Sequence, residues 1–145
     1  MSINIPISFD VNTSDPAVPL GLTVRFDGAE VFNSAHITQQ TSINIECSDD
    51  DGDHVLEIEM LGKLPEHTKI NEAGEITQDA VLKLSNIVID GINIEKIFTD
   101  VAEYTHNFNG HGDTVTERCY DTLGCNGIMR LKFTTPVYLW LLENM

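Results

Sequence analysis

The chain has 145 residues, 41% of them hydrophobic, which is enough for one domain over residues 1–145 whose core buries roughly two thirds of the unfolded surface. Eight basic residues against 23 acidic ones give a formal charge of −15, so the chain repels the phosphates of nucleic acids and the anionic headgroups of membranes. No apolar run approaches the ~20 residues that span a bilayer, and the segment MSINIPISFD has neither region of a signal peptide, so we expect a soluble protein.

Two segments near the N-terminus alternate apolar and polar residues in the manner of β-strands. Apolar side chains recur at every second position over residues 3–11 and 20–26, which predicts two half-buried strands. Pro6 lacks a backbone donor, so we expect the first strand to lie at a sheet edge or to kink there. Asp27-Gly28 follows the second strand and is typical of a type I′ turn, so a return strand should follow directly.

The middle of the chain continues this pattern. Alternating apolar positions over residues 43–47 and 56–60 predict a strand on each side of the acidic segment CSDDDGDH. Residues 62–79 are rich in Pro, Gly, Asn and charge, so we expect a long surface loop that can hold a small hairpin about NEAGE. Residues 80–98 predict a further strand pair that turns at Asp90-Gly91.

The last third of the chain mixes clear and ambiguous segments. We favour a strand over AEYTHNF, and the alternation in GIMRLKF predicts a final strand that Pro136 ends. The tail VYLWLLENM is apolar on both parities, so we expect it to be buried or paired, with Trp140 in the core.

These segments indicate the fold class. They amount to about eight to ten short strands separated by Gly, Asp and Asn turns, without an amphipathic helix of about ten residues or more. This pattern predicts an all-β, antiparallel β-sandwich that is jelly-roll-like, because an α/β fold would alternate strands with long helices.

The acidic segment CSDDDGDH, residues 47–54, is a candidate metal site. Asp49, Asp51 and Asp53 stand at alternate positions, and Gly52 permits the bent backbone from which several oxygen ligands could converge on Ca²⁺. The EF-hand pattern is incomplete, since it lacks the bidentate glutamate and strands rather than helices flank the segment. The same residues fit a hairpin tip in which Asp51-Gly52 makes the turn and the other aspartates are hydrated, so both interpretations stay open.

A second polar cluster lies in YTHNFNGHGD. Polar side chains on the end loops of β-sandwiches often bind ligands, and amides and carboxylates match sugar hydroxyls while the ring of Tyr104 or Phe108 offers an apolar face. Two histidines and an aspartate could also hold a transition metal, but the two histidines differ in parity, so only a loop could bring them together. A plain turn rich in Gly and Asn is the alternative. The candidate ligand-binding residues are Tyr104, His106, Asn107, Asn109, His111 and Asp113.

The sequence offers little for catalysis. It contains no G-x-S-x-G elbow, no glycine-rich phosphate loop, no H-E-x-x-H and no local signature of a cysteine nucleophile, so we expect no enzyme activity. A carboxylate pair for glycoside hydrolysis is the least favoured alternative, because the separation of carboxylates cannot be read from a sequence.

The cysteines favour a reducing compartment. Three cysteines cannot all pair within one chain, and Cys47, Cys119 and Cys125 lack the spacing of zinc ligands. A Cys119–Cys125 bridge remains open, since the gap between them permits one without requiring it.

Four segments carry a resemblance to a known group: VRFDGAEVF, DDDGDHVLEIEMLGK, SNIVIDGINIEKIF and GCNGIMRLKFTTPVYLWLLENM. They resemble small β-sandwich proteins encoded by large tailed phages of marine cyanobacteria, over most of the chain and most specifically in residues 124–145. Residues 21–98 are also similar to calcium-dependent carbohydrate-binding modules of the xylan-binding type, in which a strand, an Asp-Gly turn and an acidic loop recur on a jelly roll. That second resemblance implies Ca²⁺ ligands at Asp49, Asp51 and Asp53.

The phage resemblance implies a function class. We expect a non-enzymatic phage protein, a virion-associated structural or adsorption component that acts through binding or assembly, located in the virion or soluble in the infected host cytoplasm. A stand-alone calcium-dependent carbohydrate-binding module is the alternative. The expected partners are other phage structural proteins or a host surface glycan, with a homo-oligomer also open. Sugar recognition predicts a polar cleft with an aromatic face, whereas assembly predicts a flat apolar patch that could include part of the C-terminal tail.

Overall fold

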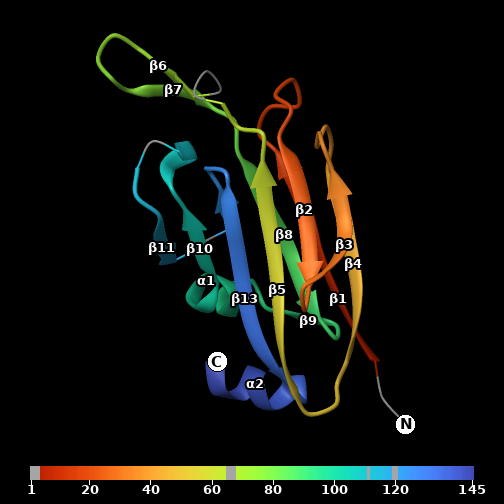
Figure 1. The fold of residues 1–145 in the computed structure, drawn as a ribbon. Helices are drawn as coiled ribbons and strands as arrows, with labels where there is room; N and C mark the ends of the chain where they lie inside the picture. Colours follow the sequence, from red (N-terminus) through yellow and green to blue (C-terminus); the bar gives the residue numbers. More distant parts are fainter. Residues whose placement is uncertain (1–3, 65–67, 111, 119–120) are drawn as a thin grey trace.

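The structure, a computed structural model, describes residues 4–64, 68–110, 112–118 and 121–145. In this part of the chain, two antiparallel sheets form an all-β sandwich with short helices at its periphery (Figure 1). The first sheet has the order β12 (Thr122–Leu123), β8 (Leu82–Ile89), β1 (Asn4–Thr13) and β4 (Thr41–Ser48), and β9 (Ile92–Asn93) pairs with β8. The second has the order β11 (Val115–Arg118), β10 (Glu103–His106), β13 (Gly127–Thr135), β5 (Gly52–Leu61), β2 (Gly21–Phe26) and β3 (Ala29–Ser34).

The chain passes repeatedly from one sheet to the other. It starts in the first sheet with β1, makes β2 and β3 in the second, returns with β4, and crosses again for β5, β8, β10, β12 and β13. Such alternation between two packed antiparallel sheets is typical of jelly-roll-like sandwiches. The predicted fold class is therefore confirmed.

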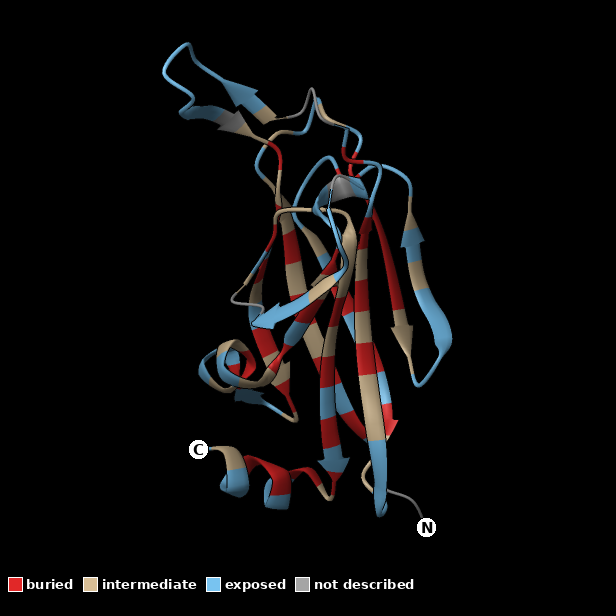
Figure 2. Ribbon diagram, turned by 60° about the vertical axis from the view of Figure 1, so that its left-hand side comes forward, coloured by how far each residue is buried: buried red, intermediate tan, exposed pale blue. Residues whose placement is uncertain are grey.

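The core lies between the sheets and is formed by the apolar side chains that the predicted alternation directs inward. Side chains at alternate positions of β1, β4, β5 and β13 are buried, and Figure 2 shows these alternating buried positions along the strands. They include Ile5, Ile7, Phe9, Val11, Ile43, Ile45, Leu56, Ile58, Met60, Met129, Leu131 and Phe133. Each fully buried side chain of this kind contributes roughly 1.5–3 kcal/mol, so their sum is the main force that holds the sheets together.

Both Asp-Gly hairpins have the predicted turns. Asp27 and Gly28 join β2 to β3 with φ angles of 50° and 86°, and Asp90 and Gly91 join β8 to β9 with φ angles of 49° and 79°. Positive φ at both central residues is the requirement of a type I′ turn, which aspartate tolerates and glycine adopts freely.

The first strand is not at a sheet edge, which corrects one expectation. β1 pairs with β4 on one side and with β8 on the other. The Pro6 carbonyl accepts a hydrogen bond from the backbone N–H of Asp90 at 2.8 Å, and Asp90 lies just beyond the end of β8. The N–H that Pro6 lacks would face Asp90, beyond the last residue pair of the β1–β8 ladder. No hydrogen bond of the ladder is therefore lost, and a central strand can contain this proline.

Two segments expected to be extended or paired are helical. α1 (Glu95–Val101) follows β9 directly; the Asn93 side chain accepts the N–H of Glu95 at 2.9 Å, and Phe98 is buried. α2 (Val137–Asn144) forms the tail, and helical spacing buries Val137, Trp140 and Leu141. Trp140 in the core is thus confirmed, but the expectation that the tail is buried or paired is wrong for one face of the helix, where Leu142 is exposed. No helix in the described ranges has the length and apolar character to cross a membrane.

The loop over residues 62–79 contains the expected small hairpin. β6 (Thr68–Ile70) and β7 (Ile76–Asp79) form a two-stranded sheet apart from the other two, which projects from one end of the sandwich (Figures 1 and 2). Asn71 closes the turn by accepting the N–H groups of Ala73 and Glu75 on its side-chain oxygen, at 2.9 and 3.0 Å. At the base, the buried ammonium of Lys63 donates to Asp79 at 2.6 Å, which anchors the hairpin to the body.

Candidate functional site

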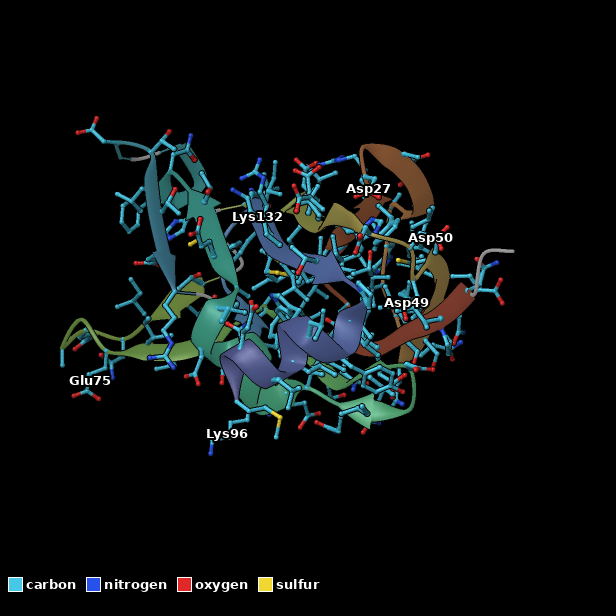
Figure 3. The ribbon with its side chains drawn as sticks, turned by 90° about the horizontal axis from the view of Figure 1, so that it is seen from below. Asp27, Asp49, Asp50, Glu75, Lys96 and Lys132 are labelled. Carbon is cyan, nitrogen blue, oxygen red and sulfur yellow. The ribbon has the colours of Figure 1, made fainter. Side chains whose placement is uncertain are left out.

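The acidic turn between β4 and β5 holds the start of α2. Asp49 Oδ1 accepts the backbone N–H of Val137 at 2.8 Å, and Figure 3 shows Asp49 beside this helix. The first N–H groups of a helix have no partner within the helix, and a carboxylate there also lies at the positive end of the helix dipole. Asp49 therefore stabilises the helix start, a role for the acidic segment that neither of its two sequence interpretations includes.

The three candidate calcium ligands differ in their surroundings. Asp49 is bonded to α2, Asp51 is exposed in the turn, and Asp53 lies on β5 at the rim of a pocket on the outer face of the second sheet. Among the described residues, no three His, Cys, Asp or Glu side chains are grouped to hold a metal ion. A calcium site at these aspartates stays a prediction.

His54 links this turn to the two neighbouring strands. Its Nδ1 lies 2.7 Å from Asp27 Oδ2, and its Nε2 lies 3.1 Å from Thr135 Oγ1. The Thr135 hydroxyl donates to the carbonyl oxygen of Asp50, and Asp27 Oδ1 accepts the N–H of Val55 at 2.8 Å. A continuous set of hydrogen bonds thus joins the β2–β3 turn, the acidic turn and the end of β13.

The order carboxylate, imidazole, hydroxyl is also that of hydrolase triads. In a triad the hydroxyl donates to the imidazole and its oxygen faces the substrate. Here the single hydroxyl proton of Thr135 is directed at the Asp50 carbonyl, and Thr135 is buried. That proton is therefore not available for donation to His54 Nε2. This set of bonds fits a structural link and not a nucleophile.

The candidate ligand cluster lies beside a pocket of about 720 Å³ at the edge of the second sheet. β10 directs Tyr104 and His106 to one face, and β11 supplies Glu117, which pairs with Tyr104 in the strand register. The 3₁₀-helix η2 (Phe108–Gly110) adds Phe108, and the segment before β13 closes the far side. The described lining residues of this β10–β11 pocket are Tyr104, His106, Phe108, Glu117, Arg118, Thr122, Gly124 and Cys125.

Contacts between three rings and one side-chain hydrogen bond organise the β10–β11 pocket. The imidazole of buried His106 lies between Tyr104 and Phe108, with ring centroids 5.0 and 4.8 Å away. His106 Nε2 lies 2.7 Å from Glu117 Oε1. The Phe108 residue is 48% exposed and the Glu117 side chain 58%, so an apolar ring and a carboxylate are both open to a ligand.

The other candidate ligand residues have different positions. Asn107 lines a smaller neighbouring pocket, and its side-chain oxygen accepts the N–H of Gly110 at 2.9 Å, which shapes η2. Asp113 is exposed in the loop before β11. The side chain of Asn109 and the whole of His111 lie outside the described part of the chain. Of the six candidates, the structure therefore brings Tyr104 and His106 together in the β10–β11 pocket.

Glu117 and Cys125 line the β10–β11 pocket but are not among the predicted residues. Glu117 faces Tyr104 only because β11 pairs with β10, and no local motif marks it. Cys125 reaches the pocket because the Tyr104 hydroxyl donates to its carbonyl oxygen and accepts its N–H. Predicting β11 over Val115–Arg118 and pairing it with β10 would have located Glu117.

The described cysteines are protonated, free thiols. Burial raises the pKa of Cys47 to about 11, and burial is also the largest cause of the raised pKa of Cys125. Neither is therefore an activated nucleophile at neutral pH. Cys119, and with it the test of a Cys119–Cys125 bridge, lies outside the described residues.

A further pocket, of about 740 Å³, lies on the outer face of the second sheet. Its main cation, Arg130, is already paired with Glu57 at 2.9 Å. Lys132 is exposed on this face (Figure 3), but the pocket rim also carries Asp53 and Glu103. This balance of charge gives an anionic ligand little attraction.

Comparison of the chain with models of protein families, with curated proteins and with solved structures gave no match.

Asp49→Ala tests the role of the acidic turn. We expect it to lower the free energy of unfolding by about 1 kcal/mol, because the Val137 N–H loses its acceptor. Asp51→Ala, in the same turn but exposed, should change it by less than about 0.5 kcal/mol. Urea titration in chelator-containing buffer measures both, and equal effects of the two substitutions would contradict the role of Asp49.

Proposed function

We propose that this protein is a non-enzymatic, virion-associated component of a tailed phage that acts through binding, and that the β10–β11 pocket binds a sugar residue of a host surface glycan. One observation carries the proposal: the half-exposed Phe108 ring and the Glu117 carboxylate flank the same pocket. The proposed phage origin rests on the sequence resemblance. The proposed adsorption role rests on the chemistry of the pocket.

The β10–β11 pocket provides the two contacts that a pyranose needs. The carbon-bound hydrogens of one sugar face can pack on the Phe108 ring, and a hydroxyl group can donate to Glu117. His106 holds one oxygen of that carboxylate at 2.7 Å, so its position is fixed before the ligand arrives. Arg118 donates to the Thr99 carbonyl and to Asp100, each at 2.5 Å, and so forms a fixed part of the wall.

The second candidate function is a stand-alone calcium-dependent carbohydrate-binding module. It shares the same pocket and adds an ion at Asp49, Asp51 and Asp53. The specific observation that favours it is the exposure of Asp51 and Asp53, which leaves both carboxylates accessible to a cation. Calcium dependence separates the two functions.

The sugar site can be tested at Phe108 and at Gly112. A Cβ added at Gly112 would lie 2.7 Å from Phe108 Cδ2, so Gly112→Ala displaces the ring without removing it. We expect wild-type protein to bind sugars on a glycan panel, and both Phe108→Ala and Gly112→Ala to weaken the best of them at least about tenfold by titration calorimetry, a loss of about 1.4 kcal/mol.

Val31→Ala is the matched control, because Val31 is an exposed apolar residue on the opposite edge strand, β3. Its affinity should equal that of wild type. Absence of any bound sugar on the panel, or equal affinity of all variants, would contradict the proposal.

Calcium is tested by titration calorimetry on chelator-treated protein, with the thermal midpoint followed in parallel. If the second candidate holds, wild type binds Ca²⁺ saturably with a raised midpoint, and Asp51→Asn/Asp53→Asn loses both effects. Under the first candidate we expect sugar binding that is indifferent to Ca²⁺ and no midpoint shift.

A further inference from the structure

The charge inside the β10–β11 pocket depends on where His106 carries its proton. The backbone N–H of Phe108 donates to His106 Nδ1 at 3.3 Å. A backbone N–H can only donate, so Nδ1 bears no proton in this arrangement. The ring proton is therefore on Nε2, which donates to Glu117 Oε1 at 2.7 Å. His106 is thus a neutral imidazole, and the Glu117 carboxylate keeps its full negative charge.

The two described cations at this pocket are each paired with another carboxylate. Arg118 is the one cation among the described lining residues, and its guanidinium lies 2.5 Å from Asp100. Lys63 lies behind the pocket wall, where its buried ammonium pairs with Asp79 at 2.6 Å. Neither cation is left to balance Glu117, so the described part of the pocket carries a net negative charge.

The Cys125 thiol, which lines the same pocket, is affected by this charge. Burial is the largest cause of its raised pKa, the charges of Lys63 and Asp79 act on that pKa in opposite directions, and the charge of Glu117 raises it further. The field of Glu117 therefore extends into the pocket. A cationic group placed there would be attracted by the same field.

His106 also fixes both groups that a cationic ligand would contact. Its Nδ1 accepts from the backbone of Phe108, and its Nε2 donates to the carboxylate of Glu117. Phe108 has a φ of 56°, in the left-handed region that few residues other than glycine adopt, and the hydrogen bond to His106 stabilises it there. Ring and carboxylate are thus positioned before a ligand binds, which lowers the entropic cost of binding.

A negatively charged pocket with an exposed ring favours a ligand with a positive charge. An ammonium group donates a charge-assisted hydrogen bond to a carboxylate, and it is attracted to an aromatic face within about 6 Å; a neutral hydroxyl donates a weaker hydrogen bond. We propose that the β10–β11 pocket binds an amino sugar, whose ammonium group pairs with Glu117 while its carbon-bound hydrogens pack on Phe108. This inference rests on the proposed function and names the class of sugar.

The charge of the whole chain acts in the same direction. A formal charge of −15 attracts a cationic sugar and repels an acidic one, such as a uronic acid. Dissolved ions screen this attraction. Binding of an amino sugar should therefore weaken as salt is added, while binding of a neutral sugar should not respond.

The test compares sugars that differ at one position. The probes are the methyl glycosides of glucosamine, N-acetylglucosamine and glucose, which carry an ammonium, an acetamide or a hydroxyl group at carbon 2, with the matching galactose series in parallel. Each is titrated into the nitrogen-15-labelled protein at neutral pH to about 100 mM, which covers millimolar dissociation constants, while NMR follows the backbone amides of Phe108 and Glu117. We expect the amine of at least one series to bind about tenfold more tightly than its two neutral relatives, and this advantage to shrink in about 1 M NaCl.

Glu117→Gln tests the source of the preference. It keeps the length of the side chain and an oxygen that can accept from His106, but it removes the charge. The ratio of the dissociation constants of the N-acetyl sugar and the amine should fall from about ten to about one. Glu30→Gln removes the same charge from an exposed position on the opposite edge strand, β3, and should keep the wild-type ratio.

Failure of this inference is distinguishable from failure of the proposed function. If neutral sugars bind and Phe108→Ala weakens them, but the amine has no advantage or keeps it in Glu117→Gln, the amino-sugar inference is overturned and the proposed function stands. If no sugar shifts the pocket amides, both are overturned. Nα-acetyl-lysine amide is the last probe, because binding as tight as that of the amino sugar would mean that the pocket recognises an ammonium group and not a sugar. The salt response and the comparison of sugars use the wild type, so they test the inference even if Glu117→Gln does not fold.

Discussion

The hydrogen bonds around His54 are the interaction on which the position of α2 depends. The apolar strands can form the sandwich without them, and burial of Val137, Trp140 and Leu141 holds α2 against the core, but these hydrogen bonds fix where the helix starts. His54 ties Thr135 to Asp27, Thr135 ties the end of β13 to the acidic turn, and that turn holds the first N–H of α2 through Asp49. Thr135 is buried and the His54 side chain is only 15% exposed, so leaving a polar atom of either residue unpaired would be costly.

The outward face of α2 follows from this arrangement. Once Val137 is held by Asp49, helical spacing directs Trp140 and Leu141 into the core, where the Trp140 ring meets Phe133 at 5.9 Å. Tyr138 then points outward and donates to Asp90 at 2.6 Å. The β10–β11 pocket is built from other elements, so its lining does not depend on how α2 is held.

Local chemistry made much of the fold predictable. Alternation in β1, β4, β5 and β13 and the turns at Asp27-Gly28 and Asp90-Gly91 depend on neighbours in sequence, and these predictions are confirmed. The secondary structure of the tail was ambiguous in the sequence because the tail is apolar on both parities. Its helix start is bonded to Asp49, which lies 88 positions away. For the same reason the sequence suggested Tyr104 and His106 but missed Glu117, which only strand pairing brings to them.

Amide hydrogen exchange of α2 tests most directly whether the His54 and Thr135 bonds hold this helix. Thr135→Val keeps the shape of the side chain and removes the hydroxyl, and Thr134→Val, at an exposed position next to it, is the control. We expect Thr135→Val to reduce the protection of α2 amides roughly tenfold while those of β1 keep theirs, since loss of a buried hydrogen bond favours local opening. Unchanged α2 protection in Thr135→Val would contradict the account.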